Sequence, residues 1–145
     1  MPGTLYLEIV TAERLVYSGP VDSINAPGSE GRLGVLPGHM GLLTGLVAGE
    51  LRLRPRDEDE EISLAIGGGY LEVSEDKVIV LAHSAERGSE IDVERALQAR
   101  ERAVHRIEER SAGVDLDRAR AALARAEARV HVAESYRRTH SEPGR

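Results

Sequence analysis

Short apolar runs alternate with turn-forming residues over the first 85 residues of the chain. The runs are rich in Val, Ile and Leu and are separated by Gly, Pro, Asp and Ser, which is typical of short strands joined by tight turns. In residues 51–54, Leu and Arg alternate, so the Leu and Arg side chains point to opposite faces of a strand. The predicted strands cover residues 5–10, 15–17, 21–26, 33–36, 51–54, 62–66, 70–73 and 78–82. Such close spacing favours an antiparallel sandwich or barrel.

From Ile91 onward the apolar residues recur with the period of a helix. In the first predicted helix the residues on one side are Val93, Ala96, Leu97, Ala103, Val104 and Ile107. In the second predicted helix, apolar residues recur at alternating spacings of three and four, as in the seam between two packed helices. These residues are Leu116, Ala119, Leu123, Ala126, Val130 and Ala133. The intervening Ser-Ala-Gly at 111–113 predicts a turn, so the two helices are expected to form an antiparallel hairpin.

These patterns predict an α+β fold, with an N-terminal antiparallel β-sandwich of about ten strands followed by a C-terminal antiparallel two-helix hairpin. Residues 1–85 are assigned to the sandwich, 86–137 to the hairpin and the aperiodic 138–145 to a disordered tail. The hairpin seam is mostly Ala, which buries little apolar area against an ordering cost of about 1–2 kcal/mol per residue. We therefore expect the hairpin to depend on a partner surface or a ligand and to change its arrangement with either.

Composition narrows the classes of function. The 145 residues include no Cys, which excludes disulfide and thiolate chemistry, and no Phe or Trp. The charge is uneven, because residues 1–85 carry 13 acidic and 6 basic side chains whereas residues 86–145 carry 12 and 13. Without a basic excess or interleaved aromatics, nucleic acid is not expected as a partner. No stretch resembles a secretory signal or an apolar span, so we expect a cytoplasmic chain that does not insert into a membrane.

Three local features have structural interpretations. The five consecutive carboxylates at 57–61 cannot be buried unpaired and predict an exposed turn. The glycine-rich segments 28–34 and 67–69 lack the Lys-Ser/Thr ending of a phosphate loop and do not join a strand to a helix, so turns and close sheet contacts are expected there. His39 has no partner at metal-ligand spacing, so no metal site is predicted.

Several segments resemble the epsilon subunit of bacterial F-type ATP synthase, in the same order and spacing. They are GRLGVLPGH at 31–39, GEL at 49–51, AIGGGYLEV at 65–73, VIVLA at 78–82 and IDVERA at 91–96, and the resemblance extends from about residue 4 to residue 137. It implies the same sandwich and hairpin, in a non-catalytic subunit of the rotor's central stalk on the cytoplasmic face of the bacterial membrane. It also implies that the sandwich contacts the gamma subunit and the c-ring of a proton-translocating synthase.

The resemblance implies further partner contacts. Glu30, Arg32, His39 and Met40 resemble the end of the sandwich that faces the c-ring, although some relatives have an acidic residue in place of Arg32. The family's hairpin permits rotation when folded against the sandwich and opposes ATP hydrolysis when extended into the catalytic head. In the extended state, the basic residues of the second helix can meet an acidic surface of the beta subunit; these are Arg118, Arg120, Arg125 and Arg129. The alternative for each is a solvated charge.

The start of the first helix carries a second hypothesis. Either Ser89 or Asp92 can cap the helix, which accounts for Asp92 without a ligand. The cap does not account for the arginines that follow. Spacing places Arg95 and Arg102 on one face of the first helix, and two further arginines, four residues apart, share a face of the second. If these faces meet, four guanidinium groups converge with no carboxylate between them, and a nucleotide triphosphate suits them because Arg binds phosphate oxygens bidentately.

The resemblance implies the same ligand. Some bacterial relatives bind ATP in the folded hairpin through an Ile/Leu-Asp-x-x-Arg-Ala motif and arginines, and the matching residues are Glu86, Asp92, Arg95, Arg102, Arg125 and Arg129. Glu86 and Asp92 are expected to face the adenine amino group or ribose, since carboxylates repel phosphate. ATP would be a regulatory ligand, with no cofactor required. Two alternatives remain: a purely structural stalk subunit without a ligand response, and a free-standing ATP-sensing module.

Overall fold

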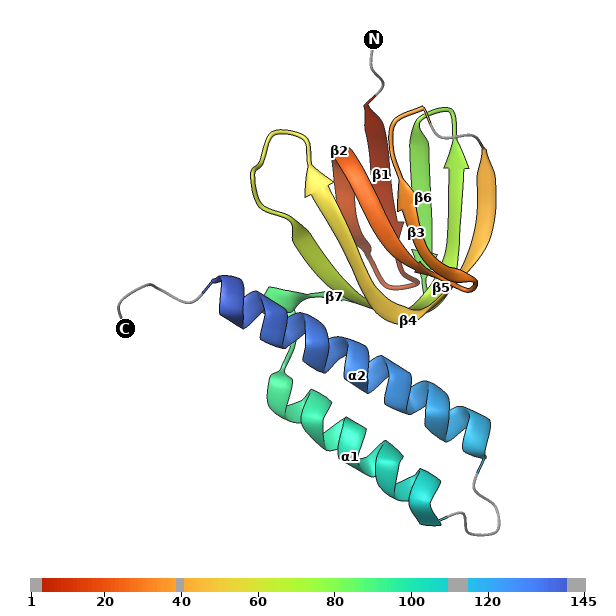
Figure 1. The fold of residues 1–145 in the computed structure, drawn as a ribbon, viewed down its shortest axis with the longest axis vertical. Coiled ribbons are helices and arrows are strands. Elements are labelled where there is room, and N and C mark those ends of the chain that lie inside the picture. The colour runs from red at the N-terminus through yellow and green to blue at the C-terminus, as the bar shows by residue number, and fades with distance from the viewer. Residues whose placement is uncertain (1–3, 39–40, 110–114, 141–145) are drawn as a thin grey trace.

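The computed structural model describes residues 4–38, 41–109 and 115–140. Within these ranges the chain forms a β-rich domain followed by two helices (Figure 1). In chain order the elements are β1 (Leu5–Val10), β2 (Leu15–Gly28), β3 (Gly31–Val35), β4 (Leu42–Pro55), β5 (Ile62–Ser74), β6 (Lys77–Ala82), β7 (Ala85–Arg87), the 3-10 turn η1 (Gly88–Glu90), α1 (Val93–Glu109) and α2 (Leu116–Thr139). The expected α+β class is confirmed.

The strands form a curved sheet that closes on itself around an apolar core. Their order is β1-β6-β5-β4-β2-β3, and β1 also pairs with β2, while the short β7 pairs with β5. The pairings are antiparallel except for the parallel pair of β1 and β6. Side chains that point inward from several strands are fully buried, among them Leu5, Leu7, Leu51, Leu53, Leu64 and Leu71. The sandwich therefore has a core of its own, separate from the helices.

The described residues contain seven strands, whereas the sequence predicted about ten. The difference arises in part because predicted breaks lie inside continuous strands: β2 passes through residues 18–20 in regular register with β1, and β5 passes through the three glycines at 67–69. Gly68 and Gly69 have positive φ angles of 98° and 145°. A Cβ added to Gly69 would overlap the Leu81 carbonyl oxygen on β6. These glycines therefore serve close strand packing, as predicted, and the acidic segment at 57–61 is an exposed turn between β4 and β5.

The two helices form an antiparallel pair in which α2 lies between the sandwich and α1 (Figure 1). Much of the predicted seam of α2 is buried, including Ala119, Ala126, Val130 and Ala133. Ala128 and Val132 are buried as well, although they lie off that seam, and they cluster with Ala65 of β5 and Ile91. α2 therefore buries two faces, one against α1 and one against the sandwich. The sandwich is the surface on which the hairpin depends in this arrangement.

The prediction of the apolar face of α1 is wrong in part. Ala96 and Ala103 are buried, but Leu97 and Val104 are 38% and 37% exposed. The reason is that α1 packs closely on α2 alone, so the contact is narrow and residues one position away lie at its edge. The element bounds also differ from the expected division, because β7 extends the sandwich to Arg87 and α2 continues to Thr139. Of the predicted tail, residues 141–145 lie outside the described part of the chain.

Candidate functional site

The connection between the sandwich and α1 is fixed by short-range hydrogen bonds. The Asp92 side chain accepts a hydrogen bond from the Arg95 backbone N–H at 3.1 Å, so Asp92, and not Ser89, caps α1. Within η1, Glu90 accepts from the Arg87 N–H at 3.0 Å and lies 3.3 Å from the Arg14 guanidinium. The pKa of the Glu90 carboxyl is lowered, chiefly by the hydrogen bond from the Arg87 N–H. Burial opposes this shift, and the interactions with Arg14 add to it. These contacts hold the start of α1 against the sandwich.

A cavity of about 320 Å³ lies at this end of the hairpin and brings together five of the six residues predicted to bind ATP. It is bounded by β7, by the segment leading into α1, by α1 itself and by α2. Its lining residues are Glu86, Ile91, Asp92, Arg95, Ala96, Ala99, Arg102 and Arg129. The faces of the two helices that carry arginines therefore meet, as the spacing predicted.

The sixth predicted residue, Arg125, lines the adjoining cavity of about 610 Å³. Its side chain passes close to β5, because a Cβ added to Gly67 would lie 3.2 Å from Arg125 Cδ. The two cavities lie along one flank of the hairpin. Their lining residues include positions 95, 99, 102 and 106 on α1 and positions 118, 122, 125 and 129 on α2, so on each helix they recur at steps of four, three and four. We call this flank the interhelical groove, and its arginines are Arg95, Arg102, Arg106, Arg118, Arg125 and Arg129.

The groove already holds carboxylates. Arg129 Nε donates to Glu86 Oε1 at 2.6 Å, and the two side chains are only 30% and 35% exposed. The prediction that no carboxylate lies between the arginines is therefore wrong, because the three-residue strand β7 brings Glu86 over α2. Within the described residues, the guanidinium groups of Arg95, Arg102 and Arg125 have no hydrogen bond or ion pair and are available to an anion.

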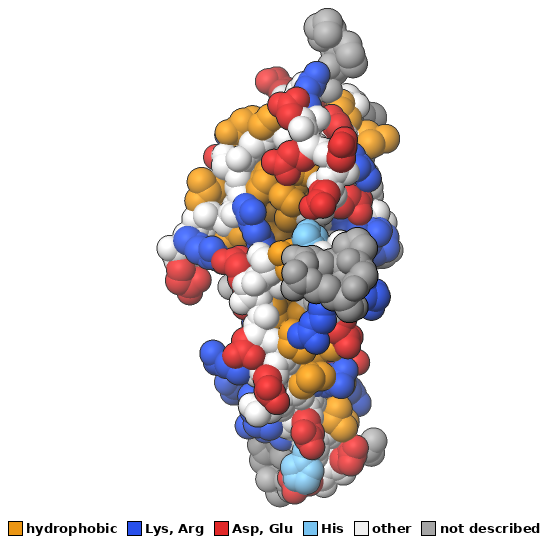
Figure 2. Space-filling view, turned by 90° about the vertical axis from the view of Figure 1, so that its left-hand side faces the viewer, with side chains coloured by type: hydrophobic (Ala, Val, Ile, Leu, Met, Phe, Trp, Pro, Cys, Tyr) orange, Lys and Arg blue, Asp and Glu red, His pale blue; other side chains and the backbone are white. Residues whose placement is uncertain are grey.

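The other two arginines of α2 that were predicted to meet the beta subunit lie on different sides of the helix. Arg118 lines the interhelical groove together with Arg125, whereas Arg120 is exposed and lines neither groove cavity. Figure 2 shows basic and acidic side chains interspersed along the helical part of one face of the molecule. Solvated charge is therefore the simplest account of Arg120, while the groove arginines share one flank.

The residues predicted to face the c-ring are only partly described. Glu30 is exposed in the turn between β2 and β3, and Arg32 follows it on β3. Arg32 Nε donates to Asn25 Oδ1 at 2.7 Å, and burial, followed by the nearby Arg52 charge, lowers the pKa of Arg32. Arg32 thus has a neutral partner within its own chain. His39 and Met40 lie outside the described residues.

One surface feature was missed at the level of sequence. Leu43, Tyr70 and Leu81 are 69%, 58% and 55% exposed on three neighbouring strands. Tyr70 is the register partner of Leu81, and Leu43 lies two residues before Gly45, the other partner of Tyr70, so all three share the outer face of the sheet. We call these three residues the outer apolar patch. The signal was present, because apolar pairs such as 42–43, 70–71 and 80–81 place one residue on each face of a strand.

Related proteins share both parts of this architecture. Residues 4–88 match the family model for the ATP synthase delta/epsilon chain beta-sandwich domain, and residues 89–134 match that for the delta/epsilon chain long alpha-helix domain. An ATP synthase epsilon chain of Moorella thermoacetica is 52% identical over 130 residues, which is 90% of this chain and 96% of that one. Its counterpart in Dehalococcoides mccartyi is 47% identical over 135 residues, or 92% and 95% of the two chains.

A solved structure supports the fold. A chain in the mitochondrial ATP synthase of Euglena gracilis has a TM-score of 0.79 with this chain at 24% identity, covering 92% of this chain and 83% of that one. Among the described residues, neither helix is long and apolar enough to cross a membrane. With two family models covering nearly the whole length and epsilon chains about half identical to it, the chain belongs to the ATP synthase epsilon-chain family, as a non-catalytic subunit of that complex.

Proposed function

We propose that this chain is a central-stalk subunit of a proton-translocating F-type ATP synthase, in which it joins the gamma subunit to the c-ring and restrains ATP hydrolysis through its hairpin. In the same proposal, ATP binds in the interhelical groove and keeps the hairpin docked on the sandwich. The observation that carries the proposal is the meeting of Arg95, Arg102 and Arg129 from two helices in one cavity beside Glu86 and Asp92.

Carboxylates lie at both ends of the groove, and arginines lie between them. Glu86 and Asp92 are at the end where β7 leads into α1, and Glu109 and Asp115 line the far cavity with Arg106, Arg118 and Arg125. A nucleotide fits this order with its base and ribose near Glu86 and Asp92 and its phosphates among the guanidinium groups, which bind phosphate oxygens bidentately. Because Arg129 pairs with Glu86, a phosphate must share or displace that carboxylate.

The groove also explains how a ligand can favour one arrangement of the hairpin. Its walls come from β7 on the sandwich, from α1 and from α2, so all three must be in place for the site to exist. A ligand that binds only the docked arrangement stabilises it by mass action, by about 1.4 kcal/mol at ten times its dissociation constant. Falling ATP would then release the hairpin.

Release exposes residues that the extended state is proposed to use. Of the four arginines proposed to contact the beta subunit, Arg118, Arg125 and Arg129 line the groove. ATP and an acidic surface on the catalytic head therefore compete for the same cations. This competition supplies the reciprocal coupling that a regulatory ligand requires.

The outer apolar patch supports a protein partner on the sandwich. Exposed apolar side chains that share one face commonly mark an interface, and we assign this one to the gamma subunit. The end that carries Glu30 and Arg32, together with His39 and Met40, is assigned to the c-ring. In the assembled enzyme the chain would lie peripherally on the cytoplasmic face of the bacterial membrane.

Titration of the full-length chain with ATP tests the ligand. We expect saturable binding with a rise in the thermal midpoint of about 4 °C at ten times the dissociation constant. Binding should fall at least tenfold in Arg95→Ala and Arg102→Ala. It should persist in the matched control Arg120→Ala, whose side chain is exposed and lines neither groove cavity.

Two results would redirect the proposal. Absence of binding at millimolar ATP, or equal binding by all these variants, leaves a purely structural stalk subunit. Binding by a chain that fails to co-purify with the other synthase subunits indicates instead a free-standing ATP sensor.

A further inference from the structure

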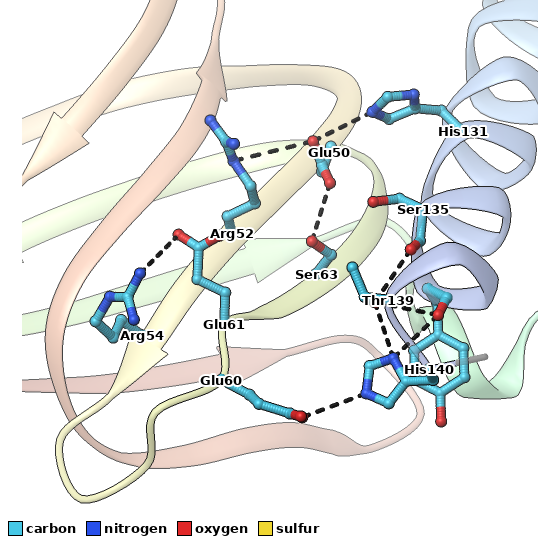
Figure 3. A pocket seen from close by; sticks show the side chains of 11 residues that line it. Glu50, Arg52, Arg54, Glu60, Glu61, Ser63, His131, Ser135, Thr139 and His140 are labelled. Carbon is cyan, nitrogen blue, oxygen red and sulfur yellow. Dashed lines mark hydrogen bonds and ion pairs between the residues drawn. The ribbon is translucent and has the colours of Figure 1, made fainter. Parts of the chain in front are cut away.

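We propose that two histidine–carboxylate contacts on the flank of α2 opposite the interhelical groove form a pH-sensitive latch, which holds the hairpin on the sandwich more tightly when the histidines are protonated. The latch consists of His131 with Glu50 and His140 with Glu60 (Figure 3). Both contacts border a cleft of about 490 Å³ between α2 and the sandwich. The inference rests on the proposed mobility of the hairpin but not on ATP binding.

The first contact joins the middle of α2 to β4. His131 Nε2 lies 3.4 Å from Glu50 Oε1, and the Glu50 side chain is only 15% exposed. The other Glu50 oxygen accepts a hydrogen bond from Ser63 Oγ at 2.9 Å, so the carboxylate is held in place by β5. A protonated imidazole at this position gives the largely buried Glu50 carboxylate a charged hydrogen-bond donor, whereas a neutral imidazole can offer it at most one uncharged N–H.

The second contact joins the end of α2 to the turn between β4 and β5. His140 Nε2 lies 3.3 Å from Glu60 Oε2, while His140 Nδ1 lies 3.0 Å from the Tyr136 carbonyl oxygen. Nδ1 is also 2.9 Å from Thr139 Oγ1, whose own proton can be donated to the Ser135 or Tyr136 carbonyl. When the Thr139 hydroxyl donates to one of these carbonyls, both ring nitrogens face acceptors. A protonated ring has an N–H for each of them, whereas a neutral ring has only one.

Two further features favour a cation at His140. It caps the C-terminal end of α2, where the helix dipole stabilises positive charge. Its ring also stacks on Tyr136 with centroids 3.9 Å apart. Tyr136 in turn lies against η1, because a Cβ added to Gly88 would come within 2.7 Å of Tyr136 Cβ. The ring is thus positioned by packing before it meets Glu60.

The other charges at the cleft do not cancel these contacts. The carboxylates facing α2 are Glu50, Glu60 and Glu61, and the cations are Arg52, Arg54 and Arg87. Arg54 lies 3.8 Å from Glu61, and Arg87 donates to the Val16 carbonyl and lies over the Tyr17 ring. Arg52 approaches Glu50 only to 4.0 Å. On α2 itself, Glu127 and Glu134 lie one turn to either side of His131 and add negative potential.

The sign of the pH dependence follows from which form makes the contacts. The contacts are charge-assisted only while the imidazole is protonated, and histidine is the side chain that changes charge between about pH 5 and 8. Docking should therefore be strongest near pH 5.5 and weaken toward pH 8. Exposed ion pairs change an equilibrium constant by up to about fivefold each, and two of them predict a change of about three- to tenfold.

Energy transfer between labels on the sandwich and α2 tests the latch in the full-length chain. The chain has no Cys, so Asp22→Cys and Ala124→Cys, both at exposed positions, place one label on each body. The docked fraction is expected to fall between pH 5.5 and 8, and the pH dependence should vanish in His131→Gln with His140→Gln. The matched control is His105→Gln, because His105 pairs with Glu109 on the same helix and joins no two bodies.

The outcomes separate the latch from the mobility on which it rests. Val132→Asp places a charge in the fully buried contact between α2 and the sandwich and should force the hairpin open. If this variant opens but the parent chain shows no pH dependence, or the double histidine variant keeps it, the latch is overturned. If the labels stay at one distance even in Val132→Asp, the mobility itself is wrong and the latch falls with it.

Discussion

The packing of α2 on the sandwich gives a quantitative prediction for Val132→Ala. Val132 is fully buried in the cluster that joins α2 to β5, where most of its neighbours are Ala residues. Removing its two methyl groups costs about 1.6 kcal/mol in transfer free energy. A residual cavity between two rigid bodies raises the total to about 2 kcal/mol. Because the interface is rich in Ala, this loss is a large share of the free energy that docks the hairpin.

Hydrogen exchange of the α2 backbone amides at constant pH measures this loss directly. A cost of 2 kcal/mol corresponds to about a thirtyfold fall in protection for amides that exchange through undocking. The matched control is Val104→Ala on α1, because that side chain is 37% exposed and should change protection less than threefold. Amides in the sandwich core should be unaffected in both variants. Equal protection of α2 in the two variants would refute the account in which the sandwich, and not α1 alone, holds α2.

Three other variants test local features of the fold. Asp92→Ala removes the cap of α1 and should cost about 1 kcal/mol in the free energy of unfolding, which Asp92→Ser should largely restore; a loss in both variants would show that the cap is not the cause. Gly69→Ala should cost at least 2 kcal/mol in urea unfolding, because the added Cβ meets the Leu81 carbonyl at a positive φ, whereas Gly34→Ala has open space and should be nearly neutral. Glu90 has a lowered pKa, so its contribution to stability is present above pH 4.5 and is lost as the pH falls through the folded-state value; Glu90→Gln should flatten that part of the pH profile, and an unchanged profile would contradict it.

Much of the fold follows from local patterns in the sequence. Residues 5–10 were predicted as a strand and form β1, because apolar residues alternate there without interruption. The breaks predicted inside β2 and β5 were wrong, since Gly and Pro mark bends within long curved strands as readily as they mark turns between short ones. Only the pairing of distant strands distinguishes the two cases, and no local pattern contains it.

The helices show a related limit. The seam spacing correctly placed Ala126 and Val130 inside the hairpin, but it did not identify Val132, which faces the sandwich. A helix packed on both sides has no single polar face, so periodicity reveals only the stronger of its two apolar stripes. Contacts with the sandwich could not be predicted from α2 alone.

The candidate site was predicted in composition but not in detail. Helical spacing was enough to place Arg95 and Arg102 on one face, and the structure brings that face to Arg129. The ion pair between Arg129 and Glu86 was missed, because it depends on β7, a strand of three residues too short to give a sequence signal. The position of Arg125 against Gly67 likewise depends on where α2 crosses β5.

The two flanks of α2 have separate proposed roles. The interhelical groove joins α2 to α1 and β7 through a site suited to a nucleotide, and the latch joins it to β4 and the following turn through histidines. Nucleotide and pH are therefore proposed to act on the same docking equilibrium through opposite flanks of α2. Their effects should add when expressed as free energies, because Arg129 pairs with Glu86 whereas His131 pairs with Glu50.

ATP is proposed to stabilise the docked hairpin by binding between its helices. The most direct measurement is hydrogen exchange of α2 in the full-length chain, at one pH, with and without saturating ATP. Protection across α2 is expected to rise at least tenfold with ATP in the parent chain and in Arg120→Ala, and not to rise in Arg95→Ala with Arg102→Ala. Unchanged protection of α2 with ATP bound, or the same gain in all three proteins, would contradict it.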